Sequence, residues 1–83
     1  MAKTVFTPEY RVLLRMLREH RNGAGVTQAE LAKRLRQTQS FVSKIERGEA
    51  RLDLVQLRQI CRILGTNLPV FVQEFERRLA GGK

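Results

Sequence analysis

The chain has 83 residues, 42% hydrophobic and 29% charged, and this length allows one compact domain with a single modest core. Sixteen Lys and Arg residues oppose eight Asp and Glu residues, which gives a formal net charge of +8. This excess of positive charge indicates an acidic partner, with nucleic acid the first candidate and an anionic membrane the second. Cys61 is the only cysteine, so an internally disulfide-bonded secreted scaffold is excluded.

The sequence shows neither a membrane span nor a targeting signal. No apolar run approaches the roughly 18 residues that a span requires, and the first twenty residues lack the charged-then-apolar order of a secretory signal. Basic residues are spread over the chain and not concentrated on one long amphipathic helix, which makes a membrane-surface protein the weaker interpretation. We therefore expect a cytoplasmic protein that does not bind membranes.

The first helix is predicted to begin at Pro8, where a proline suits the first helical position and Thr7 can cap the free N–H groups. Its apolar face carries residues at helical spacing, namely Leu13, Met16, Leu17 and His20. The glycines at positions 23 and 25 end it. Residues 1–6 and 80–83 are expected to be flexible tails around an ordered core of about 8–79, so residues 1–83 form a single domain.

Two short helices follow in close succession. Thr27 and Glu30 have the spacing of a capping box, which predicts a second helix that ends near Arg36. Thr38 can cap a third helix over residues 39–47, and Gly48 ends it. The turn between these helices is too short for the third helix to run back along the second, which predicts a helix-turn-helix with the start of the third helix projecting outward.

Two further helices complete the pattern. Asp53 and Gln56 form a second capping box, and the helix they begin ends at Gly65 with an apolar stripe of Leu54, Leu57, Cys61 and Leu64. A fifth helix is predicted to begin at Leu68 or Pro69 and to run to about Leu79, with Phe71, Val72, Phe75 and Leu79 on its apolar face. Since no segment alternates like a strand, the domain should be all-α and compact, with five helices.

The string TQAELAKRLRQTQSFVSKIERGE resembles the Cro/lambda-repressor-type (XRE) helix-turn-helix family of DNA-binding transcription regulators. The matching features are T-Q-x-E-L-A in the second helix, V-S-x-I-E-x-G at the end of the third, and a leucine-rich fourth helix that closes with L-G. The resemblance covers about residues 8–79 and implies a lambda-repressor-like fold. One departure is Arg36, because the family commonly has glycine in this turn.

The resemblance implies a set of DNA contacts. Gln39 and Ser40 at the start of the third helix would meet base edges in the major groove, with Ser43 and Lys44 one turn later on the same face. Lys44 suits guanine or a phosphate equally. The phosphate contacts would come from residues on both sides of this helix, namely Gln28, Thr38, Arg47 and Arg51. Such a protein would be nucleoid-associated when bound.

One reading helix covers only about four to six base pairs, so a homodimer on a palindrome with half-sites about 34 Å apart is expected. The fifth helix is the predicted interface, through Val70, Phe71, Phe75 and Leu79. The alternative is that Phe71 and Phe75 complete the core of the monomer. Phe41 packs over the following loop or lies against DNA, and the sequence does not separate these.

The favoured function is a repressor or controller that binds double-stranded DNA. The alternative is the antitoxin of a toxin–antitoxin pair, which would act mainly by binding a partner protein and would regulate its own gene. An enzyme is not expected, because no nucleophile is paired with a base and no glycine-rich phosphate loop is present. His20 and Cys61 are too few for a metal site, and no cofactor is expected.

Overall fold

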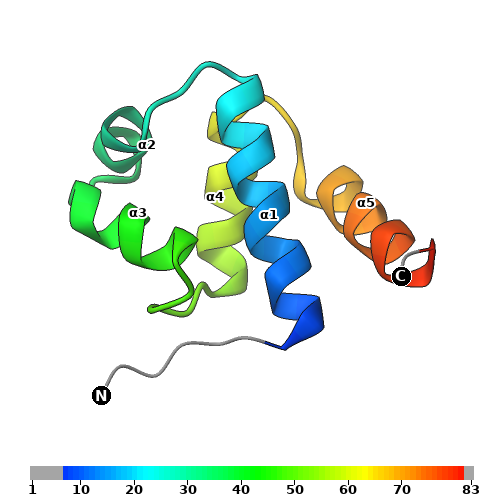
Figure 1. Cartoon of the computed structure of the whole chain (residues 1–83). Helices are drawn as coiled ribbons and strands as arrows, with labels where there is room; N and C mark the ends of the chain where they lie inside the picture. The colour runs from blue at the N-terminus through cyan, green and yellow to red at the C-terminus, as the bar shows by residue number, and fades with distance from the viewer. Residues whose placement is uncertain (1–6, 82–83) are drawn as a thin grey trace.

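The computed structural model describes residues 7–81 and contains five α-helices and no strand in that range. The helices are α1 (Pro8–Gly23), α2 (Gln28–Leu35), α3 (Gln39–Glu46), α4 (Leu54–Ile63) and α5 (Leu68–Gly81). The all-α five-helix prediction is confirmed. Figure 1 shows α1 running through the middle of the molecule, with α2 and α3 on one side of it, α5 on the other and α4 behind it.

The predicted caps position the helices that carry the candidate site. Thr27 Oγ1 accepts a hydrogen bond from the Glu30 N–H at 3.0 Å, and the Glu30 carboxylate accepts one from the Thr27 N–H at 2.9 Å. Asp53 and Gln56 make the same reciprocal pair of bonds at the start of α4. Since each bond satisfies an N–H that would otherwise lack a partner, these four residues fix where α2 and α4 begin.

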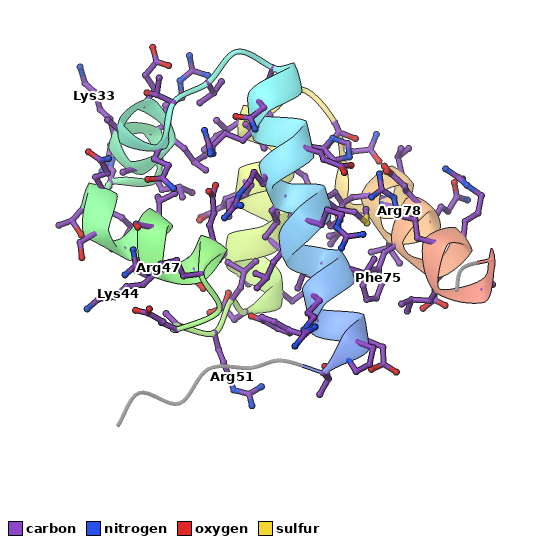
Figure 2. The ribbon with its side chains drawn as sticks, viewed as in Figure 1. Lys33, Lys44, Arg47, Arg51, Phe75 and Arg78 are labelled. Atoms are coloured by element: carbon purple, nitrogen blue, oxygen red, sulfur yellow. The ribbon has the colours of Figure 1, made fainter. Side chains whose placement is uncertain are left out.

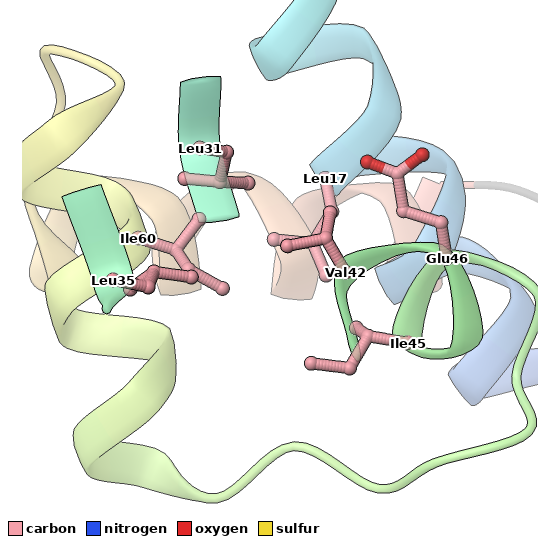
Figure 3. A pocket seen from close by; sticks show the side chains of 7 residues that line it. All are labelled: Leu17, Leu31, Leu35, Val42, Ile45, Glu46 and Ile60. Atoms are coloured by element: carbon pink, nitrogen blue, oxygen red, sulfur yellow. The ribbon is translucent and has the colours of Figure 1, made fainter. Parts of the chain in front are cut away.

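The core lies where α1, α2, α3 and α4 meet. Figure 3 shows the apolar side chains that converge there, namely Leu17, Leu31, Leu35, Val42, Ile45 and Ile60. The space left among them is only about 10 Å³, roughly the volume that one water molecule needs. Ala32 is also buried, as the close approach of α2 to its neighbours requires, and Cys61 is confirmed as a core residue.

Two sequence predictions need correction. Leu54, expected on the buried stripe of α4, has a side chain that is 66% exposed, because the neighbouring helices of the described chain do not reach it, and Ile60 is buried instead. Helix α5 extends to Gly81, two residues beyond its predicted end near Leu79, so it includes Ala80 and Gly81 from the predicted tail. The remaining residues of the two predicted tails, 1–6 and 82–83, lie outside the described part of the chain.

The turn between α2 and α3 has a left-handed residue, Arg36, at the place where the family commonly has glycine. Arg36 has φ 59° and ψ 42°, and the Gln37 N–H bonds to the Ala32 carbonyl at 2.8 Å. This closes α2 and directs the chain into α3. A residue with a Cβ atom pays about 1 kcal/mol or more for this conformation.

We expect Arg36→Gly to raise the free energy of unfolding by up to about 1 kcal/mol, because the relief of left-handed strain exceeds the extra backbone entropy that glycine loses on folding. Arg34→Gly is the matched control, since it removes the same exposed charge from inside α2 and should cost about 1 kcal/mol. Urea denaturation measures both. A loss of stability in Arg36→Gly would show that the arginine side chain itself stabilises the turn.

Candidate nucleic-acid interface

The first turn of α3 is exposed and polar, whereas the opposite face of the helix is buried. Thr38 caps the helix by accepting the Phe41 N–H at 3.1 Å, and Gln39 and Ser40 are exposed in the first turn, which contains no acidic residue. Val42 and Ile45 on the opposite face are buried in the core. The tip therefore presents hydroxyl and amide groups, together with the positive end of the helix dipole, to any ligand that approaches it from solvent.

Thr38 can serve two partners at once. Its hydroxyl oxygen accepts the capping bond, so its O–H remains able to donate to an anion such as a phosphate. Phe41, whose place the sequence left open, is half-buried and packs against the core.

The second turn of α3 carries Ser43 and Lys44. Lys44 is exposed and projects away from the body of the molecule (Figure 2). Ser43 is half-buried, and its hydroxyl accepts a hydrogen bond from Arg47 Nη1. The structure therefore brings the four predicted base-contact residues to one end and one side of α3, with Ser43 the least accessible of them.

Arg47 is held by a neighbouring carboxylate. Its Nε and Nη2 atoms donate to the two oxygens of Glu49, each at 3.0 Å. Hydrogen bonds from Arg47, followed by the charges of Arg47 and Lys44, hold the pKa of Glu49 below its usual value. Arg47 must exchange this carboxylate for a phosphate if it is to bind one.

Arg51 differs from Arg47 because it has no ion pair with any residue between 7 and 81. It is exposed in the loop between α3 and α4, and its side chain extends outward in Figure 2. A guanidinium in this state can bind a phosphate without first losing another partner.

Gln28, the fourth predicted phosphate contact, is bonded internally. It is half-buried, and its Nε2 donates to Glu46 Oε1 at 2.9 Å. The amide has a second N–H and a carbonyl oxygen, so this bond orients the side chain and leaves donor capacity.

The carboxylate that holds Gln28 is the one buried charged side chain in the described part of the chain. The Glu46 side chain is only 4% exposed. Arg21 Nε lies 2.6 Å from its Oε2 and Arg21 Nη2 lies 3.1 Å from its Oε1, while Arg18 Nε is 3.7 Å away. Arg21 also donates to the Val26 carbonyl at 3.0 Å. One carboxylate thus joins α1, the start of α2 and the end of α3.

Burial raises the pKa of Glu46, but hydrogen bonds from Arg21 and Gln28, together with the charges of Arg21 and Arg18, outweigh this and hold the pKa below its usual value. Sequence reasoning alone does not identify Arg21 as the partner of Glu46. The available signal was a glutamate on the same face of α3 as Val42 and Ile45, because a carboxylate at a core-facing position requires a cation.

On the other side of the molecule, α5 is tied to the last turn of α1. The His20 ring nitrogen Nε2 lies 3.0 Å from Glu74 Oε1, and Arg78 Nη2 donates to Glu74 at 2.6 Å and to Glu19 at 2.7 Å. The hydrogen bond from His20 is the main cause that lowers the pKa of Glu74. Figure 2 shows Phe75 and Arg78 on the side of α5 that faces α1.

This packing corrects the predicted dimer interface at one residue. Phe71 is 2% exposed and stacks at a tilt against His20, with ring centres 5.3 Å apart, so it belongs to the core of the monomer as the sequence-based alternative held. Phe75 and Leu79 are half-buried, and Val70 is 50% exposed. Of the four predicted interface residues, only Val70, Phe75 and Leu79 remain available to a partner.

No helix within residues 7–81 is long and apolar enough to cross a membrane. In the same range, no group of three His, Cys, Asp or Glu side chains is placed to hold a metal ion.

A family model described as a helix-turn-helix domain matches residues 9–71, which is more than half of the chain. The chain belongs to the helix-turn-helix family. Among solved structures, it is similar to an XRE-family like protein from Pseudomonas syringae pv. tomato str. DC3000, with 45% sequence identity and a TM-score of 0.79 over 83% of this chain and 84% of that one. These matches confirm the XRE-type resemblance.

Two more distant structures have the same fold. The clp gene regulator ClgR from Corynebacterium glutamicum is 28% identical, with a TM-score of 0.76 over 89% of this chain and 79% of that one. The wild-type Restriction-Modification Controller Protein C.Esp1396I is 21% identical, with a TM-score of 0.79 over 90% and 97% of the two chains. No curated protein sequence matches the chain. We therefore describe the chain below as an XRE-type regulator, a DNA-binding regulator of transcription.

In this XRE-type regulator, we expect Glu46→Gln to lower the free energy of unfolding by about 2–4 kcal/mol, because Arg21, whose side chain is only 12% exposed, would lose its counter-charge. Glu49→Gln, which removes a carboxylate from an exposed pair, should change stability little. Chemical denaturation at neutral pH compares the two variants. Equal losses would show that the burial of Glu46 adds nothing to the strength of its pairing.

The same variant should have a flatter pH dependence. Because the pKa of Glu46 is lower in the folded protein than in the unfolded chain, its stabilisation is present above the unfolded pKa and is lost as the pH falls through the folded pKa. The stability of the wild type should therefore fall below about pH 4.5, the ordinary glutamate value, more steeply than that of Glu46→Gln. Denaturation curves from pH 7 to pH 3 test this, and parallel curves would contradict it.

Proposed function

We propose that this XRE-type regulator acts as a repressor or controller that reads a palindromic operator as a homodimer, with α3 in the major groove. Gln39, Ser40, Ser43 and Lys44 would contact base edges. The amide of Gln39 suits adenine, because it offers one donor and one acceptor in the geometry of the adenine edge.

The observation that carries this proposal is the exposed first turn of α3. It projects polar side chains from a helix whose other face is buried, and it has no carboxylate that would repel phosphates.

The phosphate contacts would surround this tip. Thr38 would donate its free O–H, Gln28 its second N–H, and Arg51 its unpaired guanidinium. Arg47 would join them after leaving Glu49. Binding would therefore weaken steeply as salt is raised.

The proposed dimer interface is on α5, through Val70, Phe75 and Leu79. Val70 and Val72 are two of the four large apolar side chains that are most exposed in the described structure. Phe75 and Leu79 follow Val72 at helical spacing and share its side of α5, and both remain half-exposed. Covering this face with a second copy would remove apolar surface from water and double the length of DNA that is read.

Gln39→Ala tests the reading helix. We expect it to weaken binding to the selected operator by about 1–3 kcal/mol and to relax the preference at one base pair of each half-site. Gln73→Ala is the matched control, because Gln73 is an exposed glutamine on α5. Selection of bound duplexes from a random pool, followed by titration of the recovered operator, measures both effects. If Gln39→Ala binds the operator as the wild type does, Gln39 does not read bases.

Val70→Glu tests the interface. Val70 lies in the first turn of α5, where a glutamate is favourable to the helix, so the variant should fold normally. A second copy that covers Val70 would bury each new carboxylate without a cation, and self-association should weaken about tenfold or more.

Val55→Glu is the control for this test, because Val55 is an exposed valine in the first turn of α4. Analytical ultracentrifugation compares both variants with the wild type. If Val55→Glu disrupts the dimer and Val70→Glu does not, the dimer interface lies on α4. A wild-type chain that is monomeric at micromolar concentration and binds a palindrome without cooperativity would refute the homodimer.

A further inference from the structure

A groove of about 400 Å³ between the end of α2 and the outer side of α4 is not used by the proposed DNA contacts. Four arginines surround it, and two half-buried apolar residues form its floor. We call it the arginine groove and define it by Arg34, Leu35, Arg36, Arg58, Arg62 and Ile63. No residue of α3 lines it.

The charges of this groove are not balanced. Elsewhere the protein pairs its partly buried arginines with glutamates, as Arg21 with Glu46 and Arg78 with Glu74. No carboxylate lines the arginine groove, and among residues 7–81 none forms an ion pair with any of its four guanidiniums. Arg34 acts on Glu30, one turn earlier in α2, only through its electric field.

Holding these four charges together costs stability in the free protein. Arg58 and Arg62 are four residues apart on α4, which brings like charges to neighbouring positions on one face. The repulsion is relieved when an anionic group enters the groove, so the groove favours acidic ligands over neutral ones.

The apolar floor of the groove favours a protein over a nucleic acid as its acidic partner. Leu35 and Ile63 offer an apolar surface that the charged phosphates of a nucleic-acid backbone cover poorly, whereas the side chain of a leucine or phenylalanine would cover it. The same face of α4 continues to Val55, three residues before Arg58, whose side chain is 65% exposed. Arginines beside exposed apolar side chains are typical of surfaces that bind proteins.

We propose that the arginine groove is a docking site for an acidic segment of a partner protein. Carboxylates of the segment bind the four guanidiniums, and one apolar side chain of the segment packs on Leu35 and Ile63. Because the groove shares no residue with α3, the segment and DNA bind at the same time. The site adds a protein contact to the DNA-binding function and does not depend on the operator or on the dimer.

The test titrates the full-length ¹⁵N-labelled protein with a synthetic twelve-residue peptide that has two leucines flanked by aspartates and glutamates. Saturable shifts are expected at the amides of residues 34–37 and 58–63, with residues 39–44 unaffected. The same peptide with serine in place of both leucines should bind more weakly. Equal binding of the two peptides would refute the apolar part of the site, and no saturable shift at the groove would refute the whole proposal.

The double variant Arg58→Gln/Arg62→Gln should lower the affinity for the leucine peptide about three- to tenfold. It should also raise the melting temperature by about 1–3 °C, which shows that it folds and that the repulsion is relieved. Arg15→Gln/Arg77→Gln is the matched control, since it removes two exposed arginines outside the groove. An equal loss of peptide affinity in both double variants would show that peptide binding depends only on the net charge of the protein. This result would refute the proposed site.

DNA binding gives the remaining readout. The two double variants should bind operator and non-operator duplexes with the same affinity as each other. If Arg58→Gln/Arg62→Gln instead loses more affinity than its control, and the slope of log K against log salt falls by about 2, the groove binds a DNA backbone and the proposal is wrong. This result would leave the reading role of α3 intact, because that role is tested at Gln39.

Discussion

The ion pair of Arg21 and the buried Glu46 is the interaction on which the placement of α3 depends. A carboxylate inside a domain of this size is unfavourable unless nearly all of its oxygen lone pairs are used. Here Arg21 and Gln28 supply three hydrogen bonds, and the three residues come from α1, α3 and the start of α2. The pair therefore fixes the end of α3 against two other helices, while the apolar core fixes its middle.

The same pair links stability to function. Gln28 is placed by Glu46 in the position from which it would meet a phosphate, and Arg21 also closes the loop after α1 through the Val26 carbonyl. Replacement of the ion pair by apolar residues could preserve a folded domain, yet Gln28 would lose the bond that orients it.

The features that follow from local sequence could be predicted well. Both capping boxes, the glycine that ends α3 and the exposed start of α3 depend on residues a few positions apart, so the sequence contains all the partners. The left-handed backbone of Arg36 does not follow from its residue type, because a side chain with a Cβ atom disfavours that conformation.

The features that depend on tertiary contacts could not be predicted in the same way. Leu54 and Leu57 share a helix face in sequence, but only the second is covered by neighbouring helices. Phe71 and Val70 are adjacent residues on α5, and only the docking of α5 on α1 decides that the first is buried and the second is exposed. The choice of Arg21 as the partner of Glu46 likewise required the path of α1.

The last turn of α1 has two roles in the architecture. Arg18 and Arg21 on this turn face the carboxylate at the end of α3, while Glu19 and His20, on the same four residues, hold α5 through Arg78 and Glu74. The C-terminal end of α3 and one side of α5 are thus both attached to a single stretch of α1 backbone about 5 Å long. In a dimer formed through α5, this short stretch of α1 would set the separation and tilt of the two α3 helices. Such a dimer would tolerate little variation in the spacing of the two DNA sites that it contacts.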